Sequence, residues 1–194
     1  MADDEDPGVR PGGKGFPPPE VYRAIKLVVF DVDGVLTDGR IVLDAHGVES
    51  KFFHVRDGSG MTFLRKADLL LALVTGRSSP VVDVRARELD IPAARVKQGA
   101  RVKLPVFREL LAETGLAAAQ AAFVGDDLID LPVLEAAGLA CCPGDAHPEV
   151  RRACHVIATR PGGRGGARQI CEHLLKQRAD GSWEKAIGRY LDRI

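Results

Sequence analysis

The chain has 194 residues, of which 27 are Lys or Arg and 27 are Asp or Glu, so its formal net charge is zero. This length suits one domain that buries its own core, and a neutral chain lacks the overall field that draws proteins to nucleic acid or to anionic membranes. No apolar run approaches the about 20 residues that a membrane-spanning helix requires. We therefore expect neither nucleic acid nor a membrane as a partner.

The start of the chain and its cysteines bear on its cellular compartment. The first residues, MADDED, are acidic and lack the apolar stretch of a secretory signal. No CxxC pair occurs among the four cysteines, which are Cys141, Cys142, Cys154 and Cys171. We interpret them as reduced thiols in the core of a cytoplasmic protein.

Residues 1–20 combine charged side chains with glycines and the run Pro17–Pro18–Pro19. Such a segment buries too little apolar surface to offset the entropy that it would lose on becoming ordered. We predict a mobile tail over residues 1–20 and a single domain over residues 21–194.

Short apolar runs alternate with helix-like patterns from residue 25 onward. Strands are expected over residues 25–30, 69–74, 121–124 and 138–142, and helices over 60–67, 80–89, 103–114, 131–137, from about 168, and in a C-terminal tail of about 180–194. Because a helix between two parallel strands makes a right-handed crossover, this order predicts an α/β fold with a doubly wound, mostly parallel sheet.

One insertion interrupts the alternation at residues 40–55. Two β-like runs, residues 40–43 and 48–55, are joined by a turn in which Gly47 can supply a positive φ. The predicted β-hairpin carries more apolar side chains than a short excursion can bury alone, and an isolated hairpin leaves its edges open. Packing against the hairpins of other subunits would cover both the apolar side chains and the open strand edges.

Two carboxylates follow the first predicted strand, in the sequence Asp31–Val32–Asp33–Gly34. In a doubly wound sheet, ligands bind at the carboxyl ends of the strands, and Gly34 allows the chain to turn away sharply there. Carboxylates so close together repel each other unless a cation lies between them, and hard oxygen ligands suit Mg²⁺. The motif predicts a magnesium site, although alone it is also compatible with a solvated turn.

Three further polar groups favour the magnesium site over that turn. Residues 74–77 (VTGR) end the next strand with a hydroxyl, a glycine and a guanidinium, and residues 125–127 (GDD) end a third strand, with Asp130 close behind. Lys103 opens a predicted helix and can contact a phosphoryl oxygen. Together these groups place acid, hydroxyl, ammonium and acid near successive strand ends of one sheet.

The motifs DVDGV, VTGR, a downstream Lys and GDDLID, in this order, resemble the four motifs of the haloacid dehalogenase superfamily of phosphohydrolases. Within it, longer strings resemble the 3-deoxy-D-manno-octulosonate 8-phosphate phosphatases, at residues 31–39, 55–61, 125–133, 145–150 and 161–175. That family has a Rossmann-like sheet, lacks a large cap domain and carries only a small hairpin after the first motif, as at residues 40–55. The likeness covers about residues 25–175.

The resemblance implies a role for each motif residue. Asp31 would attack phosphorus to form an aspartyl-phosphate, and Asp33 would protonate the leaving oxygen and then activate water. Mg²⁺ would be held by Asp31, the main-chain carbonyl of Asp33 and Asp126. Thr75 and Lys103 would hold the phosphoryl oxygens.

Five further polar residues are candidates on weaker grounds. Asp127 and Asp130 are expected to orient the metal shell or the phosphate-binding lysine rather than to bind the metal directly. Arg56, Arg77 and Arg85 suit the carboxylate of a sugar acid, but surface arginines are also often simply solvated.

The resemblance implies a magnesium-dependent phosphatase that converts 3-deoxy-D-manno-octulosonate (KDO) 8-phosphate into KDO and phosphate in lipopolysaccharide precursor synthesis. It also implies a homotetramer with shared active sites, in which the C-terminal tail contacts either a neighbour or its own subunit. A phosphatase for a nine-carbon keto-deoxy sugar acid 9-phosphate is an alternative, although that group carries Glu in place of Arg77 and Lys in place of Glu88. A non-catalytic assembly domain is disfavoured because Asp31, Asp33 and Lys103 are all present.

Overall fold

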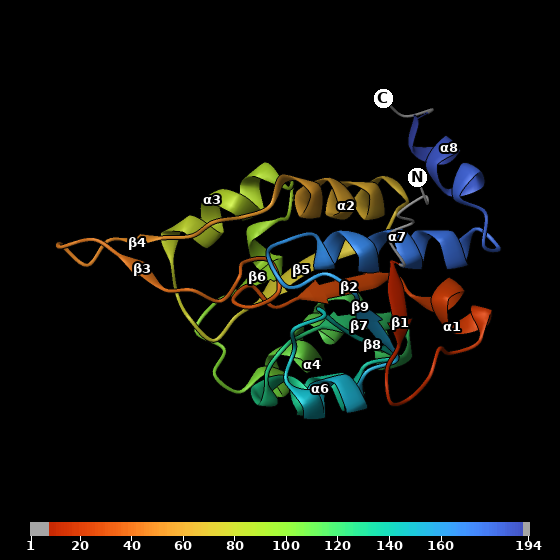
Figure 1. Ribbon diagram of the computed structural model, residues 1–194, viewed down its shortest axis with the longest axis horizontal. Coiled ribbons are helices and arrows are strands. Elements are labelled where there is room, and N and C mark those ends of the chain that lie inside the picture. Colours follow the sequence, from red (N-terminus) through yellow and green to blue (C-terminus); the bar gives the residue numbers. More distant parts are fainter. Residues whose placement is uncertain (1–7, 192–194) are drawn as a thin grey trace, which may run out of the picture.

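The computed structural model describes residues 8–191, in which seven strands form one sheet with helices on both faces (Figure 1). The strand order is β1-β9-β8-β7-β2-β5-β6, and every pair is parallel except β1 with β9. The strands are β1 (Val9–Pro11), β2 (Leu27–Phe30), β5 (Leu70–Val74), β6 (Val96–Lys97), β7 (Ala121–Val124), β8 (Leu139–Cys142) and β9 (Val156–Ala158). The predicted doubly wound, mostly parallel sheet is confirmed.

The helices divide between the two faces of the sheet, each with its own apolar core. On one face pack α1 (Pro19–Ala24), α2 (Val55–Lys66), α3 (Pro80–Glu88), α7 (Gly166–Arg178) and α8 (Trp183–Leu191). On the other pack α4 (Lys103–Thr114), α5 (Leu131–Ala136) and α6 (Pro148–Ala153). Short 3₁₀ turns lie at Ala93–Arg95, Ala118–Gln120 and Leu128–Asp130. Within residues 8–191, no helix is long and apolar enough to cross a membrane.

The central strands are apolar at every position because both of their faces are covered. In β2, Val28 and Phe30 enter the core under α2 and α7, whereas Leu27 and Val29 enter the core under α4. Successive side chains of a strand point to opposite faces, so a strand buried on both sides loses the usual polar alternation. This burial explains why continuous apolar runs located the strands correctly.

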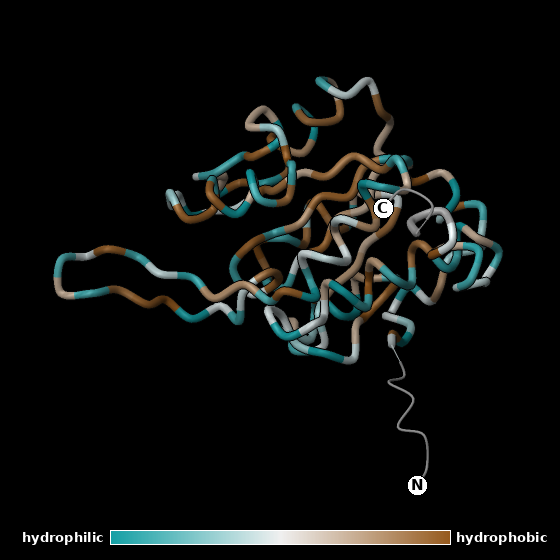
Figure 2. The backbone as a smooth tube through the Cα atoms, turned by 90° about the horizontal axis from the view of Figure 1, so that it is seen from above, coloured by the Kyte–Doolittle hydropathy of each residue, from teal (hydrophilic) through white to brown (hydrophobic). Residues whose placement is uncertain are grey.

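The insertion forms a separate two-stranded antiparallel sheet that projects from the body of the molecule (Figure 1). Its strands are β3 (Val42–Leu43) and β4 (Glu49–Ser50), and Gly47 adopts φ +78° in the turn. Both arms carry hydrophobic stretches along their length (Figure 2). Within the described part of the chain it is the only insertion between β2 and α2, so a large cap domain is absent there.

The hairpin is shorter, and the helix after it longer, than the sequence predicted. The second strand was expected to continue to residue 55 and the helix to begin at residue 60, but α2 begins at Val55. Gly58 and Gly60 have low helix propensity and hid the first turns of α2. Both glycines are buried, and a Cβ at Gly60 would lie 3.1 Å from the Cβ of Cys171 on α7, so close helix packing explains the small residue there.

The prediction of a mobile tail over residues 1–20 is wrong for residues 8–20. Strand β1 pairs with β9, and the chain then makes backbone hydrogen bonds from Gly12 to His155 and from Lys14 to Cys154, at 3.0 and 3.1 Å. A Cβ at Gly12 would lie 2.2 Å from the carbonyl oxygen of Cys154, so this glycine permits the close approach of two backbones. Residues 1–7 lie outside the described residues.

The C-terminal helix α8 packs on its own subunit. Ala186 is buried in the core under α2 and α7, and Trp183 lies partly buried against the same core. This packing favours contact of the C-terminal tail with its own subunit over contact with a neighbouring subunit. Residues 192–194 lie outside the described part of the chain.

Candidate active site

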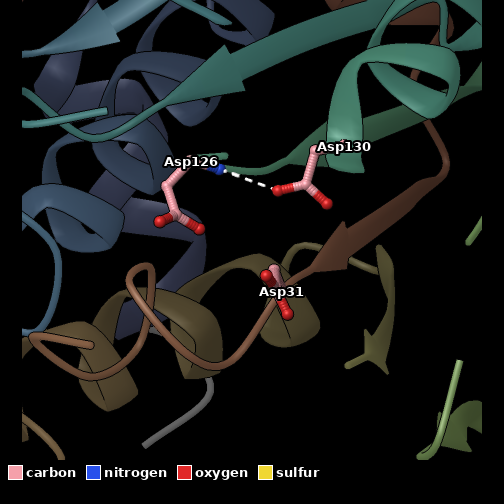
Figure 3. A group of neighbouring side chains, drawn as sticks. All are labelled: Asp31, Asp126 and Asp130. Atoms are coloured by element: carbon pink, nitrogen blue, oxygen red, sulfur yellow. Dashed lines mark hydrogen bonds between the residues drawn. The ribbon is translucent and has the colours of Figure 1, made fainter. Parts of the chain in front are cut away.

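Three acidic side chains meet at the carboxyl ends of β2 and β7. Asp31 directly follows β2, and Asp126 lies two residues after β7, its parallel neighbour. The side chains of Asp31, Asp126 and Asp130 face a common space (Figure 3), and one ligand atom from each lies within 4.8 Å of the others. The ends of these two strands therefore bring three carboxylates together, and Asp130 rather than the side chain of Asp33 completes the group.

Gly34 shapes the floor of this cluster. It adopts φ +87°, and a Cβ built on it would lie 2.0 Å from Oδ2 of Asp126. The loop before α7 packs on the same turn, since Gly163 N–H donates to the carbonyl of Val35 at 3.0 Å and a Cβ at Gly162 would lie 1.8 Å from the carbonyl oxygen of Gly34. The glycine-rich segment over residues 162–166 thus supports the Asp33–Gly34 turn, besides leading into α7.

Burial raises the pKa of both candidate metal ligands. The pKa of Asp31 rises to about 7, chiefly because the carboxyl group is buried, although the neighbouring Lys103 partly opposes the shift. The pKa of Asp126 rises to about 8 through burial and the nearby Asp31 charge. Asp126 Oδ1 is buried without a hydrogen-bond partner. A divalent cation beside these oxygens would stabilise both charges and complete the coordination of the unpaired atom.

Asp130 belongs to this cluster but is already fully engaged by other partners. Its Oδ1 accepts from Lys103 Nζ at 2.6 Å, and its Oδ2 accepts from the backbone N–H groups of Asp126 and Asp127 at 3.0 and 3.3 Å. It is completely buried. This arrangement fits the expected orienting role, whereas the exposed Asp127 caps the following 3₁₀ turn by accepting from Leu128 N–H at 2.8 Å.

Lys103, the first residue of α4, places a buried ammonium group between two carboxylates. Its Nζ lies 2.7 Å from Asp31 Oδ2 and 2.6 Å from Asp130 Oδ1. Burial alone would lower the pKa of Lys103, but the two carboxylates raise it above its ordinary value. A permanently charged ammonium beside Asp31 can hold a phosphoryl oxygen as the carboxylate approaches phosphorus.

Thr75 follows β5, which is the other parallel neighbour of β2. Its hydroxyl donates to Asp33 Oδ2 at 3.4 Å, and its backbone is fixed by bonds with Lys97 O and Ala100 N. The residues predicted to bind phosphate are therefore brought to the same strand ends as the acidic residues.

Lys51, which the motifs did not identify, also contacts the site. It lies just after β4, and its Nζ donates to Asp33 Oδ1 and lies 3.5 Å from Glu49 Oε1. Its side chain is only 2% exposed. No periodic or motif signal marks this residue, because its position depends on where the base of the hairpin folds back over the sheet.

The structure does not bring the three predicted substrate arginines together. Arg77 donates to Glu49 Oε1 at 2.7 Å, and Arg85 pairs with Glu88 at 3.0 Å while its guanidinium lies 5.4 Å from the ring centre of Phe53. Arg56 instead lines a separate surface pocket. Among the described residues, no hydrogen bond or ion pair joins these arginines to Asp31, Asp33 or Asp126.

Comparison with known proteins agrees with this geometry. A sequence profile for haloacid dehalogenase-like hydrolases matches residues 102–165. The 3-deoxy-D-manno-octulosonate 8-phosphate phosphatase of Escherichia coli K12 is 40% identical over 165 residues, which are 85% of this chain and 86% of the relative.

Solved structures give the same result. The 3-deoxy-D-manno-octulosonate 8-phosphate phosphatase of Yersinia pestis has a TM-score of 0.80 and 38% identity, over 84% of this chain and 86% of that one. The enzyme of Moraxella catarrhalis, in complex with a magnesium ion, a phosphate ion and KDO, has a TM-score of 0.80 and 37% identity, over 84% and 92% of the two chains. The chain belongs to the family of 3-deoxy-D-manno-octulosonate 8-phosphate phosphatases, within the haloacid dehalogenase-like hydrolases.

Proposed function

We propose that this phosphatase hydrolyses KDO 8-phosphate to KDO and inorganic phosphate, as a step in lipopolysaccharide precursor synthesis. The observation that carries the proposal is the contact of Lys103 with Asp31, beside an Asp126 oxygen that is buried without a partner. A nucleophile, an ammonium for phosphoryl oxygens and a metal-binding oxygen thus lie together. The named substrate of the relatives supports the choice of sugar acid.

Asp31 and Asp33 divide the chemistry between them. The Asp31 carboxylate attacks phosphorus and forms an aspartyl-phosphate, while Asp33 gives its proton to the departing sugar oxygen. Asp33 then takes a proton from water, whose oxygen attacks phosphorus, and phosphate leaves with Asp31 restored. Thr75 and Lys103 hold the non-bridging oxygens in both steps.

The donor set suits Mg²⁺, with Asp31, Asp126 and the main-chain carbonyl of Asp33 as its protein ligands. Mg²⁺ would be held there by hard oxygen atoms, which are the ligands that this ion prefers. When bound, the ion neutralises phosphoryl charge, so that an anionic nucleophile can approach. Asp130 orients the Lys103 ammonium and the backbone of Asp126 by accepting a hydrogen bond from each.

Recognition of the sugar acid is assigned to the arginines. Arg77 lies at the strand end after Thr75, and its partner Glu49 holds it at the base of the hairpin, where a substrate carboxylate can replace that partner. Arg85 and Arg56 stay further candidates for binding the substrate, although in this subunit Arg85 pairs with Glu88 and Arg56 lines a separate pocket. The presence of Arg77 and Glu88 favours the eight-carbon acid over the nine-carbon one.

We also propose a homotetramer in which the hairpins pack together and each subunit borders its neighbour's site. The proposal is supported by the exposed apolar side chains of the hairpin, which are Ile41, Val42, Leu43, Val48 and Phe52. The hairpin projects from the body of the molecule with hydrophobic stretches along both arms (Figure 2), while the contacts at its base with its own subunit are made by the polar residues Lys51 and Glu49. A single catalytic domain, to which residues 8–20 also belong through β1 and the start of α1, carries this hairpin. Four buried, unpaired thiols support a reducing compartment, and we place the reaction in the cytoplasm.

The substrate is tested by measuring phosphate release from a panel of sugar phosphates and sugar-acid phosphates. KDO 8-phosphate is expected to give the highest kcat/KM, by at least about tenfold over a nine-carbon keto-deoxy acid 9-phosphate, because each misplaced contact costs about 1–3 kcal/mol. The Asp31→Asn variant serves as the blank. A higher kcat/KM for the nine-carbon acid would refute the substrate, and no phosphate release from any compound would leave only the assembly-domain alternative.

A further inference from the structure

The base of the hairpin is tied to the active site by one buried lysine. Lys51 Nζ donates to Asp33 Oδ1, and the lysine side chain is 2% exposed although it belongs to a projecting insertion. Exposed ion pairs contribute little, whereas a buried ammonium must keep its partner or pay a large desolvation cost. The contact is therefore a fixed feature of the site and not a surface pairing.

Asp33 has few other contacts that could hold its carboxyl group. Thr75 Oγ1 reaches Asp33 Oδ2 only at 3.4 Å, which is the long end of a hydrogen bond. The carboxyl side chain is 24% exposed, so packing alone does not fix its rotamer. Without Lys51, one weak hydrogen bond within residues 8–191 would orient the carboxyl group.

Glu49 extends the contact into a short network. Lys51 Nζ lies 3.5 Å from Glu49 Oε1, and the same oxygen accepts from Arg77 at 2.7 Å. The series Asp33–Lys51–Glu49–Arg77 thus connects the strand end of β2 to the strand end of β5 through the hairpin. With Lys103, Lys51 is one of two lysines among the described residues whose ammonium groups contact carboxylates of this site.

We propose that Lys51 is a positioning residue of the reaction, whose ammonium group holds the Asp33 carboxyl in place for proton transfer to and from the substrate oxygen. A misplacement of about 1 Å in a reacting group can cost about a hundredfold in rate. The inference rests on the role proposed above for Asp33, and it assigns to the hairpin a direct part in the chemistry of its own subunit.

The test compares substrates whose leaving groups need a proton to different degrees. Lys51→Met should lower kcat for the sugar-acid phosphate by roughly 10- to 100-fold with little change in KM, because only the transition state needs a well-placed acid. For p-nitrophenyl phosphate, kcat/KM should change by less than about threefold, because nitrophenolate departs without protonation. Lys51→Arg, which keeps the charge, should recover part of the loss.

A double-mutant cycle with Asp33→Asn decides whether Lys51 acts through Asp33. If it does, Lys51→Met should cost nothing further in the Asp33→Asn background. An equal loss in both backgrounds would show a merely structural role and overturn the inference, as would a rise in KM with kcat unchanged, which would mean that Lys51 binds substrate directly. The variants of the cycle need not be equally stable, provided that circular dichroism shows each of them to be folded.

A matched control separates this role from the general loss of a lysine. Lys97 also pairs with two carboxylates, Glu109 and Glu113, but among the described residues its side chain makes no hydrogen bond or ion pair with Asp33. Lys97→Met should leave both substrates unaffected. If Asp33→Asn alone retained full activity, the role of Asp33 in the proposed function would fail and this inference with it. A dead Asp33→Asn variant beside a fully active Lys51→Met variant would refute this inference alone.

Discussion

Burial disfavours the charged forms of the Asp31 and Asp126 carboxyl groups, and a bound cation would stabilise those forms. Burial raises their pKa values to about 7 and about 8, so near neutral pH each holds a proton part of the time. A metal ion binds only the ionised forms, and its binding must release those protons.

Magnesium affinity is therefore expected to depend on pH. As pH rises from about 6 to about 8, deprotonation of Asp31 and Asp126 should strengthen Mg²⁺ binding by roughly tenfold or more, with protons released on binding. Calorimetric titrations in two buffers of different ionisation enthalpy measure both quantities. Glu113→Gln is the control and should keep the same pH dependence, because Glu113 pairs with Lys97 and does not contribute to the pKa shift of either ligand. An affinity independent of pH in this range would contradict the assignment of the two ligands.

A second prediction at the residue scale concerns Gly34. Gly34→Ala would force a Cβ to within 2.0 Å of Asp126 Oδ2, in addition to the strain of φ +87°. We expect the variant to lose about 1–2 kcal/mol of stability and most of its magnesium-dependent activity.

Gly39 provides the matched control for that substitution. It has a similar φ of +75°, but a Cβ there would meet its nearest atom only at 3.7 Å. Gly39→Ala should lose similar stability in thermal unfolding yet keep its activity. Equal activity in the two variants would mean that contact with Asp126 is not what excludes a side chain at Gly34.

The motif residues were predictable from sequence because each follows an apolar strand, and parallel strands bring their carboxyl ends together. Lys51 was not predictable from sequence, because its contact with Asp33 forms only when the chain after β4 folds back toward the sheet, and no local pattern encodes that contact. Nor did the sequence indicate that Arg77 would be engaged by Glu49, a contact that only the folded hairpin produces.

At the scale of elements, the long apolar strands and the helices between them were predicted within a few residues, because burial on both faces leaves a strong signal. The elements that sequence reasoning missed are short: β1, β6, β9, α1 and α6 have between two and six residues. So few residues carry no periodicity, and their structure is set by neighbours. Around β1, the glycines and prolines that suggest disorder flank an edge strand instead.

Strand β1 is expected to contribute stability by covering the edge of β9. Removing residues 1–14 should lower the free energy of unfolding by about 1–3 kcal/mol and expose an unpaired strand edge, which favours association. Urea unfolding measures the first effect and light scattering the second. A chain that begins at residue 8 is the control and should match the parent, whereas equal stability of the two truncated chains would show that the pairing with β9 contributes nothing.

At the scale of the whole molecule, the hairpin is the feature that a single subunit leaves unexplained. It projects from the body of the molecule with hydrophobic stretches along both arms (Figure 2). Several of its apolar side chains are exposed, and Phe52 is 65% exposed. A patch of this kind on a projecting element marks an interaction surface, and a second copy of the same hairpin offers a matching one.

The proposed tetramer predicts how the purified protein behaves in solution. Light scattering should give about four times the mass of one chain, and Ile41→Asp with Phe52→Asp should reduce it toward one, because charges cannot be buried in that contact. Val102→Asp, at an exposed apolar residue outside the hairpin, is the control and should leave the mass unchanged. A fully active parent protein with the mass of a single chain would refute the shared site.

We expect this protein to hydrolyse a sugar-acid phosphate with Asp31 as nucleophile and Mg²⁺ as its cofactor. The most direct measurement is phosphate release from KDO 8-phosphate by protein treated with EDTA, before and after Mg²⁺ is restored, with Asp31→Asn alongside. We expect no release without the metal, full activity with it, and a loss of at least about a thousandfold in the folded variant. Phosphate release by the metal-free protein, or by Asp31→Asn within tenfold of the parent, would contradict the account.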